Sequence, residues 1–600
     1  MLQQRNMALT TKAMNSFLVA AALSTCALAV NTAVDGIIVG RFVSPEALSA
    51  VNLYSPYAMA LSAILLLLAF SATSQAAYFI GERNREQTGK FISTSLLSLC
   101  VIGFLLSAYA FLFTDSYVSL VCYDYTVAPY LHTYFRIVGS GTILFLLAQF
   151  ACEVVGIDGR PSLGTRTIVI SVLCNIALDI LLTAILGLGV AGSAIATLMA
   201  NVVTVIILSG SHIFTKNCSF TISLLRNFSV SALKSILKLG GNMSVTSVFA
   251  TVFIYVANFI IQKHCGTDGL FTLSIGLIIF NICVDLSIGV GRSVTNVGGF
   301  LKGQRDWNGF RYIVNRSVRV TLLIGFAVAF SLMFGSRLLV QVFGADTPEM
   351  VDYCTKALRI FIWIVPSSMF VALMMFIYQA MMNTTLISVP TISFSVVEIV
   401  FLLAWPYLMP SETLQLSSGQ ALWYAFPLAS LLSVGIIYLI SEIVRQGDST
   451  VSRLTHIPKH TPDEETEQLQ LSIPTNMDDT AAALDSIRTF LRLGSGQVLD
   501  RQNISDGLEN KLVLCLEEIF LNINEHSGQK KHSHCYDVII RLEQDGILSV
   551  VKDDGRPFNP LVIEKEKQGL GLKILRGTCK HIDYQFMYGQ NLLILQFPYE

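Results

Sequence analysis

Long apolar stretches alternate with short polar connections over the first 445 residues of the chain. Twelve of these stretches are long enough to cross a hydrocarbon core of about 30 Å as helices. They cover approximately residues 14–41, 51–80, 91–113, 128–155, 163–185, 189–212, 237–262, 270–298, 315–343, 355–382, 386–408 and 419–444. The pattern therefore predicts a polytopic membrane protein with twelve transmembrane helices. The first apolar stretch is too long for a cleavable signal peptide.

The composition agrees with a membrane protein and excludes a water-soluble globular one. The chain of 600 residues is 53% hydrophobic and only 14% charged, with a mean hydropathy of +0.60. Alternate connections between the helices hold about 14 basic residues on one side of the membrane and about five on the other. The positive-inside rule then predicts a multi-pass protein of the plasma membrane with both termini in the cytoplasm.

The two halves of the membrane part resemble each other. Residues 34–81 align with residues 257–303 at an offset of roughly 223, and both segments consist of two helices joined by a short polar link. The first ends in the run Gly81-Glu-Arg-Asn-Arg and the second in Gly303-Gln-Arg-Asp-Trp. Because six helices return the chain to its starting side, the halves share one orientation. We expect two pseudo-twofold six-helix bundles around a central cavity, an arrangement that suits alternating access.

Acidic residues inside the predicted spans are candidates for function. A carboxylate in hydrocarbon costs roughly several kcal/mol unless it faces a cavity, is paired with a partner or binds a proton. They are Asp35, Glu153, Asp179, Asp285 and Glu398. Asn175 and Asp179 are four residues apart and so share one helix face, where Thr197 of the next helix could join them around an ion.

The other acids carry weaker signals. The repeat counterpart of Asp35 is Asn258, so only the first half keeps an ionisable group there, and we expect the coupling site in that half. Glu153 lies near the predicted cytoplasmic end of its helix, where a long side chain reaches the interface. Asp285 and Glu398 have no accompanying signal, which favours a structural role for both.

Several motifs of the first half resemble those of the multidrug and toxin extrusion (MATE) transporters. They are Val34-Asp-Gly-Ile-Ile-Val-Gly40, Ser44-Pro-Glu-Ala-Leu-Ser-Ala50, Gly159-Arg-Pro161, Asn175-Ile-Ala-Leu-Asp179 and Gly187-Leu-Gly-Val-Ala-Gly-Ser-Ala194. The resemblance spans about residues 10–445. It implies that Asp35, Asn175 and Asp179, with Thr197 as a fourth residue, line a cavity of the first lobe and bind the coupling proton or sodium ion. The chain departs from the family pattern at Asn31, where some members carry a tyrosine, and in lacking an acid in the seventh and tenth helices.

After residue 445 the character of the chain changes. The membrane part holds 24 basic and 18 acidic residues, and the remainder holds 16 basic and 23 acidic. A polar segment with several prolines predicts a linker over 446–475. Beyond it the pattern predicts an α+β domain, with helices near 479–493, 506–526 and 569–580 and strands near 536–542, 547–552, 584–587 and 592–597. The predicted domains are thus an N-lobe at 1–225, a C-lobe at 226–445, the linker at 446–475 and the α+β domain at 476–600.

Three motifs in this last domain suit a nucleotide site. Glu518 and Asn522 are four apart on one helix, so a carboxylate and an amide oxygen point into the same space, suited to orienting a nucleophile and holding Mg²⁺. Asp553 ends a strand and can accept from an adenine amino group, while Gly555 lets the backbone approach the base. The run Gly569-Leu-Gly571-Leu572 opens a helix and offers backbone N–H groups to phosphates.

Together these motifs resemble the nucleotide-binding boxes of the GHKL (Bergerat-type) ATPase fold, and in particular the anti-sigma-factor serine kinases. The resemblance implies ATP with Mg²⁺ as cofactor. It makes Glu518 the catalytic base, Asn522 the Mg²⁺ ligand, and Asp553 with Gly555 the adenine site. It also implies that Gly569 and Gly571 contact phosphate and that residues 556–568 form a lid.

The leading hypothesis is an ion-coupled antiporter that exports small cationic or amphipathic compounds, with an ATP-binding domain that regulates transport or modifies a partner. The alternative is a membrane-tethered serine/threonine kinase or sensor acting on a soluble antagonist protein. A histidine kinase is disfavoured, since no histidine lies on a long dimerising helix before Glu518. A Walker-type pump is disfavoured because the P-loop motif does not occur. We expect the lipid bilayer and a small molecule as partners, and no nucleic acid.

Overall fold

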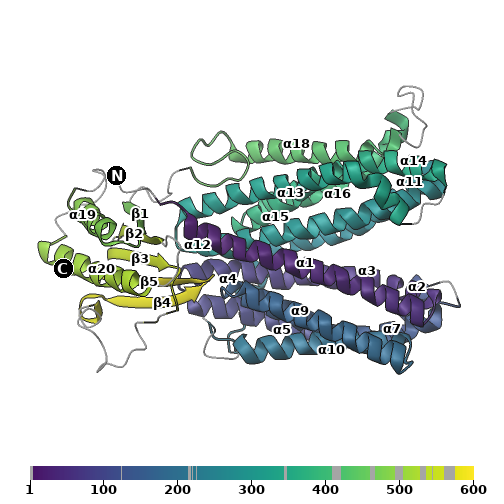
Figure 1. Cartoon of the computed structure of the whole chain (residues 1–600), viewed down its shortest axis with the longest axis horizontal. Helices are drawn as coiled ribbons and strands as arrows, with labels where there is room; N and C mark the ends of the chain where they lie inside the picture. Colours follow the sequence, from purple (N-terminus) through teal and green to yellow (C-terminus); the bar gives the residue numbers. More distant parts are fainter. Residues whose placement is uncertain are drawn as a thin grey trace. The chain divides into compact units, whose positions relative to one another are not determined.

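The computed structural model of the chain separates into two compact units (Figure 1). One contains Phe17–Ile457, and the other combines Met1–Ser16 with Pro458–Glu600. The structure describes residues 5–122, 125–213, 218, 220–223, 226–343, 347–408, 421–459, 467–493, 504–527, 535–543, 545–557, 559 and 575–599. The predicted phosphate-binding glycines Gly569 and Gly571, and most of the predicted lid, lie outside these residues.

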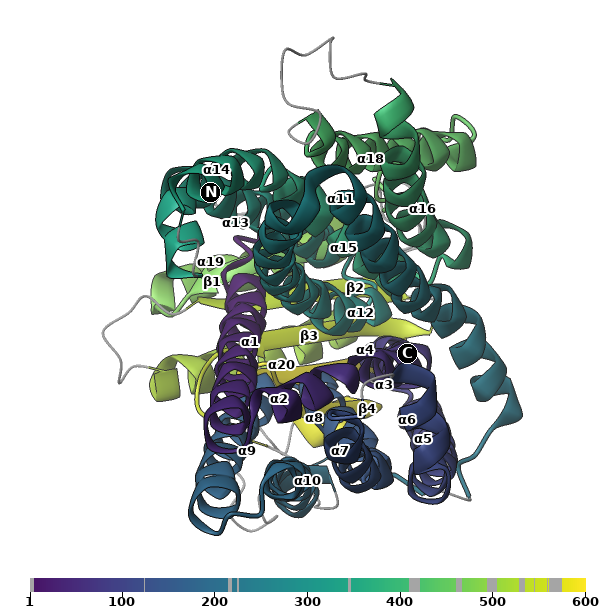
Figure 2. The ribbon, with the colours of Figure 1, turned by 90° about the vertical axis from the view of Figure 1, so that its right-hand side faces the viewer.

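The larger unit is built from helices, and α1 begins in the smaller unit and continues into it. The first half contains α1 (Ala8–Phe42), α2 (Pro45–Leu53), α3 (Ser55–Ile64), α4 (Ser71–Gly81), α5 (Arg85–Leu112), α6 (Thr114–Val121), α7 (Ala128–Ser140), α8 (Thr142–Ile157), α9 (Pro161–Asp179) and α10 (Val190–Leu208). The second half contains α11 (Val230–Ser293), α12 (Gly299–Gly303), α13 (Trp307–Val342), α14 (Pro348–Phe361), α15 (Ile364–Ala380), α16 (Thr384–Leu408) and α18 (Ala425–Arg445). Figure 2 shows the helices of the two halves gathered into two bundles, purple to blue and teal to green.

The predicted number of membrane crossings agrees with these helices. Ten helices among the described residues are long and apolar enough to span a membrane. The pair α7 and α8, bent by 50° at its break, adds one more crossing when it is taken as one span. The helical stretch Val230–Gly303 contains two crossings, because Gly266 interrupts it with φ of +64°, a backbone conformation that glycine adopts without strain. Counted in this way, the described helices match the twelve predicted spans.

The internal repeat is visible in matching details of the two halves. Arg83 and Arg305 both have positive φ, +61° and +57°, and each is followed by a residue that caps the next helix. Asn84 accepts from the Gln87 amide at 3.0 Å, and Asp306 accepts from the Gly309 amide at 3.0 Å. The two halves thus end their second helices in the same way.

The same loops bring the halves into direct contact. A Cβ atom on Gly81 would lie 2.1 Å from the Phe300 carbonyl oxygen, and one on Gly303 would lie 2.0 Å from the Tyr78 carbonyl oxygen. The Cα atoms approach so closely that only glycine fits at either position. The glycines that mark the repeat in the sequence therefore mark its pseudo-symmetric contact in the structure.

The smaller unit carries a five-stranded antiparallel sheet with the strand order β1-β2-β3-β5-β4. Its strands are β1 (Gln468–Pro474), β2 (Cys535–Glu543), β3 (Gly546–Asp553), β4 (His581–Met587) and β5 (Gln590–Pro598). Alternate strand residues such as Val538, Val551 and Leu595 form one core with apolar residues of α19 (Met477–Leu493) and α20 (Asp506–Ser527). Figure 1 shows both helices on one side of the sheet. The predicted helices and strands of the domain that fall on described residues are present within a few residues of their expected bounds.

Two features of this unit differ from the predicted domain limits. Strand β1 lies inside the segment 446–475 that the sequence predicts as a linker, and it pairs with β2 in a register that sets Leu471 opposite Val538. Its alternation was masked by the prolines and acidic residues around it. The first 16 residues also belong to this unit, because Arg5 and Lys12 pair with acidic residues of the sheet.

Candidate ion site, central cavity and nucleotide site

The predicted ion-site residues of the first half meet in the structure. Asn31 Nδ2 donates to Asp35 Oδ2 at 2.9 Å within α1. With its amide oriented to satisfy the surrounding hydrogen bonds, Asn175 on α9 donates to Asp35 Oδ1 at 3.0 Å and accepts from the Thr197 backbone N–H at 3.1 Å. Three helices, α1, α9 and α10, are therefore joined through one carboxylate and one amide.

Asp179 completes this cluster and is its most deeply buried member. The side chain is fully buried, and its Oδ1 atom has no hydrogen-bond partner among the described residues. The carboxyl group lies within hydrogen-bonding reach of Asp35 and of Ser193. A π-helix, Ile180–Ile185, begins directly after Asp179. Such π-bulges are frequent at functional sites because they reorient the side chains next to them.

Two details of the cluster were not predicted from the sequence. The Thr197 hydroxyl donates to the Ser193 carbonyl oxygen at 3.1 Å, so Thr197 reaches Asn175 through its backbone and not through its side chain. Tyr134 on α7 is buried beside both Asp35 and Asp179. No motif surrounds Tyr134 in the sequence, so only the packing of α7 reveals it. Two carboxyl groups held together in this way can share one proton or bind one cation.

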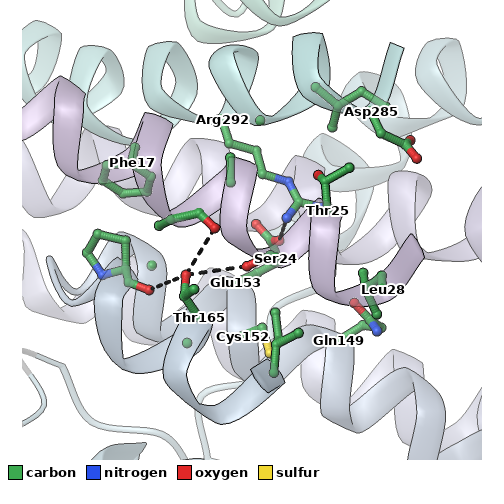
Figure 3. Close-up of a pocket in the computed structure, with 18 of the residues that line it drawn as sticks. Phe17, Ser24, Thr25, Leu28, Gln149, Cys152, Glu153, Thr165, Asp285 and Arg292 are labelled. Atoms are coloured by element: carbon green, nitrogen blue, oxygen red, sulfur yellow. Dashed lines mark hydrogen bonds and ion pairs between the residues drawn. The ribbon is translucent and has the colours of Figure 1, made fainter. Parts of the chain in front are cut away.

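A second feature is a cavity of about 760 Å³ between the two halves (Figure 3). It is lined by α1, α8 and α9 from the first half, by the second leg of α11, which follows Gly266, and by Asn296 of the π-helix Val294–Gly298. Its lining includes Ser24, whose hydroxyl donates to the Thr165 hydroxyl oxygen at 3.3 Å and so joins α1 to α9. The predicted parallel arrangement of two bundles around a central cavity is thus present.

The remaining intramembrane acids have distinct environments. Glu153 is buried and forms an ion pair with Arg292 at 3.0 Å across the two halves, where the sequence predicted a side chain reaching the interface. Asp285 lines the cavity. Glu398 on α16 is completely buried, and neither of its carboxyl oxygens has a partner among the described residues.

In the smaller unit, the predicted adenine site is organised around Asp553 at the end of β3. The Gly555 amide donates to Asp553 Oδ1 at 2.8 Å, and Asn591 Nδ2 donates to the same oxygen at 2.8 Å. Among the described residues Oδ2 has no hydrogen bond, so it remains able to accept from a base. A Cβ atom on Gly555 would lie 2.8 Å from Asp553 Oδ1, which explains the glycine.

Asn591 falls between the predicted strands 584–587 and 592–597 and orders the loop after β3. Its Nδ2 also donates to the Arg556 carbonyl oxygen at 3.1 Å, and its Oδ1 accepts from the Tyr584 hydroxyl at 2.6 Å. Burial raises the pKa of the Asp553 carboxyl above its usual range, and the hydrogen bonds from Asn591 and the Gly555 amide oppose that shift.

Glu518 and Asn522 lie on α20 one turn apart, as the sequence predicted. Glu518 is half-buried and Asn522 is exposed, so the two oxygen-bearing side chains are accessible from one face of the helix. These residues, Asp553 and Gly555 fit the donor and acceptor groups that adenine nucleotide and Mg²⁺ require.

Fold and site define a polytopic membrane protein made of two related six-helix halves and a C-terminal ATPase-like domain. A sequence profile of the MatE family matches residues 20–181 and 243–404, which are more than half of the chain. The chain belongs to this family. The two matched segments are offset by 223 residues, the offset of the internal repeat. A profile of the histidine kinase-like ATPase domain matches residues 480–597.

Solved MATE structures share the fold of the membrane part. The crystal structure of MATE in complex with MaL6 has 20% sequence identity and a TM-score of 0.66, covering 73% of this chain and 96% of that chain. A multidrug resistance MATE family transporter in an outward-facing conformation has 19% identity and a TM-score of 0.65, over 73% of this chain and 96% of that one. A MOP superfamily transporter from Pyrococcus furiosus has 19% identity and a TM-score of 0.65, over 74% and 99%. No curated protein matches the chain.

Proposed function

We propose that the protein is an ion-coupled antiporter, driven by protons or sodium ions, that exports small cationic or amphipathic compounds across the plasma membrane. The observation that carries this proposal is the cluster of Asp35, Asn175 and Asp179, in which two carboxyl groups meet in a buried site within a transporter fold. An acidic group inside the membrane destabilises the fold. Its presence there therefore points to an ion or proton pathway.

The proposed mechanism alternates the cavity between the two sides of the membrane. An ion or proton bound between Asp35 and Asp179 neutralises the pair, and its release restores negative charge in the first half. A conformational equilibrium between two states responds to a ligand that binds one of them better. Ion binding and substrate binding then favour different states of the transporter. This couples the inward movement of the ion to the export of the substrate.

The ATPase-like domain is proposed to bind ATP with Mg²⁺ on the cytoplasmic side, where both termini would lie. Asp553 and Gly555 would hold the adenine, Asn522 would hold Mg²⁺, and Glu518 would orient a nucleophile. The bound nucleotide would supply a transferable phosphoryl group, while these side chains bind and position it. We propose that this domain regulates transport or modifies a partner.

Ethidium efflux from cells that produce the full chain tests this function. Proton and sodium gradients are collapsed separately in cells with the wild type, Asp35→Asn, Glu518→Ala and the control Asp352→Asn, an exposed acid paired with Lys356. We expect efflux that depends on one gradient, is abolished in Asp35→Asn and is unchanged in Asp352→Asn. The Glu518→Ala result then shows whether nucleotide chemistry governs transport.

The competing proposal is a membrane-tethered serine/threonine kinase that acts on a soluble phosphoacceptor protein. It is favoured by the placement of Glu518 and Asn522 on one accessible helix face. It predicts phosphorylation of a partner that requires Glu518, without efflux under any gradient. That combination of results would replace the transporter proposal.

A further inference from the structure

The central cavity has few charged side chains in its lining. Three charged side chains line it: Glu153, Asp285 and Arg292. Glu153 and Arg292 neutralise each other in an ion pair of 3.0 Å, with 8% and 37% of their side chains exposed. The Arg292 guanidinium also stacks over the Phe70 ring, 4.7 Å from its centroid, which fixes it further.

Asp285 is the charged residue of the lining that does not take part in this ion pair. It lies seven residues before Arg292 on the second leg of α11, hence on the same helix face two turns away. Its side chain is exposed to the cavity and has no hydrogen bond or ion pair among the described residues. Figure 3 shows its carboxylate apart from the Glu153 and Arg292 pair. When Asp285 is ionised, the lining therefore carries one net negative charge, located at this residue.

The cavity lining combines apolar side chains with uncharged polar ones. Ile278, Ile282 and the amide Asn281 precede Asp285 on the same helix, and Leu28 and Gln149 line the cavity from α1 and α8. An unpaired carboxylate within a membrane protein is costly unless a counter-charge reaches it. A ligand with one positive charge and an apolar body would satisfy both the carboxylate and the walls.

We propose that Asp285 is the substrate-reading carboxylate of the cavity and that it selects monovalent organic cations with an apolar body. This inference rests on the proposed transport function and adds a binding residue separate from the ion site at Asp35 and Asp179. A dication would leave one charge without a partner in the cavity, so it is discriminated against.

Binding of ethidium and propidium to the purified full chain tests this inference, because the two dyes share a ring system but carry one and two positive charges. We expect tighter binding of ethidium, a loss of at least tenfold in ethidium affinity in Asp285→Asn, and recovery in Asp285→Glu. The control Asp352→Asn removes an equivalent charge outside the cavity.

Unchanged ethidium affinity in Asp285→Asn, equal affinity for both dyes, or no dye binding by the wild type would overturn the assignment. If binding depends on Asp285 while no gradient drives efflux, the cation-binding role of Asp285 stands and the transport proposal fails. The two proposals are thus separated by one set of proteins.

A second, independent observation concerns the N-terminal segment, which is docked on the sheet of the ATPase-like domain. Arg5 Nε lies 2.9 Å from Asp537 Oδ2, and both side chains are almost completely buried, at 2% and 0% exposure. The Asn6 backbone N–H donates to the Ser472 hydroxyl oxygen at 2.9 Å, and that hydroxyl donates to Asp537 Oδ1 at 2.6 Å. The segment is therefore anchored on β1 and β2.

The beginning of α1 makes further contacts beside the predicted adenine site. Gln590 Nε2 donates to the Leu9 carbonyl oxygen at 2.6 Å, and Lys12 Nζ lies 2.6 Å from Asp554 Oδ2. Asp554 follows Asp553 directly. A single helix, Ala8–Phe42, thus begins beside the nucleotide site and carries Asp35 of the ion site.

We infer that residues 5–16 form a clasp through which nucleotide binding at Asp553 acts on α1 and so on transport. This inference rests on the proposed nucleotide binding. The pair of Lys12 and Asp554, with 54% and 15% of their side chains exposed, is partly open to solvent, and such a pair contributes less to stability than a fully buried one, which suits an adjustable contact. The buried pair of Arg5 and Asp537 supplies the fixed anchor.

Hydrogen exchange of the full chain with and without ATP and Mg²⁺ tests the clasp. We expect ATP to change exchange in residues 5–16 at least twofold in the wild type. In Lys12→Glu the effect should be lost, and in the charge swap Lys12→Glu with Asp554→Lys it should be restored. Lys356→Glu is the control, since Lys356 forms a lysine–aspartate ion pair with Asp352 elsewhere.

ATP-independent exchange in residues 5–16 of the wild type, or an undiminished effect in Lys12→Glu, would overturn the clasp. ATP affinity is measured on the same samples with a fluorescent nucleotide. Absence of ATP binding in the wild type would remove the nucleotide-binding proposal together with the clasp, whereas binding without any exchange change removes the clasp alone.

Discussion

Asn31 donates a hydrogen bond to Asp35 from one turn earlier in α1, with 2.9 Å between Nδ2 and Oδ2. Asn175 donates to the other carboxylate oxygen, so two amides from two helices fix the orientation of one acid. The sequence marked Asn31 only as a departure from the family pattern. The structure gives it a place in the proposed ion site, as a residue that positions Asp35.

This arrangement predicts a graded loss of ion coupling. A hydrogen bond to a charged group contributes about 1.5–3 kcal/mol, which corresponds to roughly ten- to hundredfold in affinity. We expect Asn31→Leu to raise the half-saturating concentration of the driving ion by about that factor and Asp35→Asn to abolish coupling. The measurement is the ion dependence of ethidium efflux. Asn52→Leu, an exposed amide on α2, serves as control, and equal ion dependence in Asn31→Leu and the control would contradict the prediction.

The proposed adenine site predicts a pH dependence of nucleotide binding. Because burial raises the pKa of Asp553 above its ordinary value of 3.8, the carboxylate becomes protonated at higher pH than an exposed acid. The charged form is the better acceptor for an adenine amino group. We expect the affinity for a fluorescent ATP analogue to fall as the pH decreases through the raised pKa, and Asp553→Asn to lose at least tenfold at neutral pH.

The same shift predicts the opposite trend for stability. Between pH 3.8 and its raised pKa, Asp553 keeps its proton in the folded state, whereas the unfolded chain has released it. The contribution of protonated Asp553 to folding stability is therefore complete below pH 3.8 and is lost as the pH rises through the pKa of the folded state. Asp553→Asn should remove this loss while keeping the hydrogen bonds from Gly555 and Asn591. Apparent melting temperatures of the wild type and Asp553→Asn at several pH values above 3.8 check this, and parallel curves would refute it.

The ion pair of buried Glu153 and partly exposed Arg292 joins the two halves, and breaking it should destabilise the protein. Removing one partner of a buried ion pair costs about 3–5 kcal/mol, and the partial exposure of Arg292 places the expected cost near the low end. We expect Glu153→Gln to lower the apparent melting temperature and the additional change Arg292→Met to recover part of the loss. A double variant that is less stable than Glu153→Gln would show that the pair is not the source of the effect.

Glu398 predicts a stabilising substitution. Its two carboxyl oxygens are buried without partners among the described residues, and an unsatisfied buried polar group costs about 1–3 kcal/mol. Glu398→Met, which keeps the volume but removes the polar atoms, should raise the apparent melting temperature, whereas Glu398→Ala should lower it by leaving a cavity. If Glu398→Met abolishes efflux while the protein stays folded, Glu398 has a functional role in the second half.

The sequence by itself determined the architecture. Hydrophobic stretches of membrane-spanning length predicted the crossings, because backbone groups in lipid must bond within a helix and leave little choice of structure. The repeat was readable from Gly81 and Gly303, since a close backbone approach admits no other residue. Asn175, Asp179 and the pair of Glu518 and Asn522 were readable because residues four apart share a helix face.

Only the tertiary structure decided which distant residues meet. Tyr134, Asn591 and the cavity lining that includes Asp285 carry no periodic signal, because their contacts join helices and strands far apart in the chain. Strand β1 and the docking of Arg5 on Asp537 also escaped the sequence pattern. The sequence pattern shows which face of a helix or strand is apolar. A site forms where the faces of several elements meet, and that depends on how the whole elements pack.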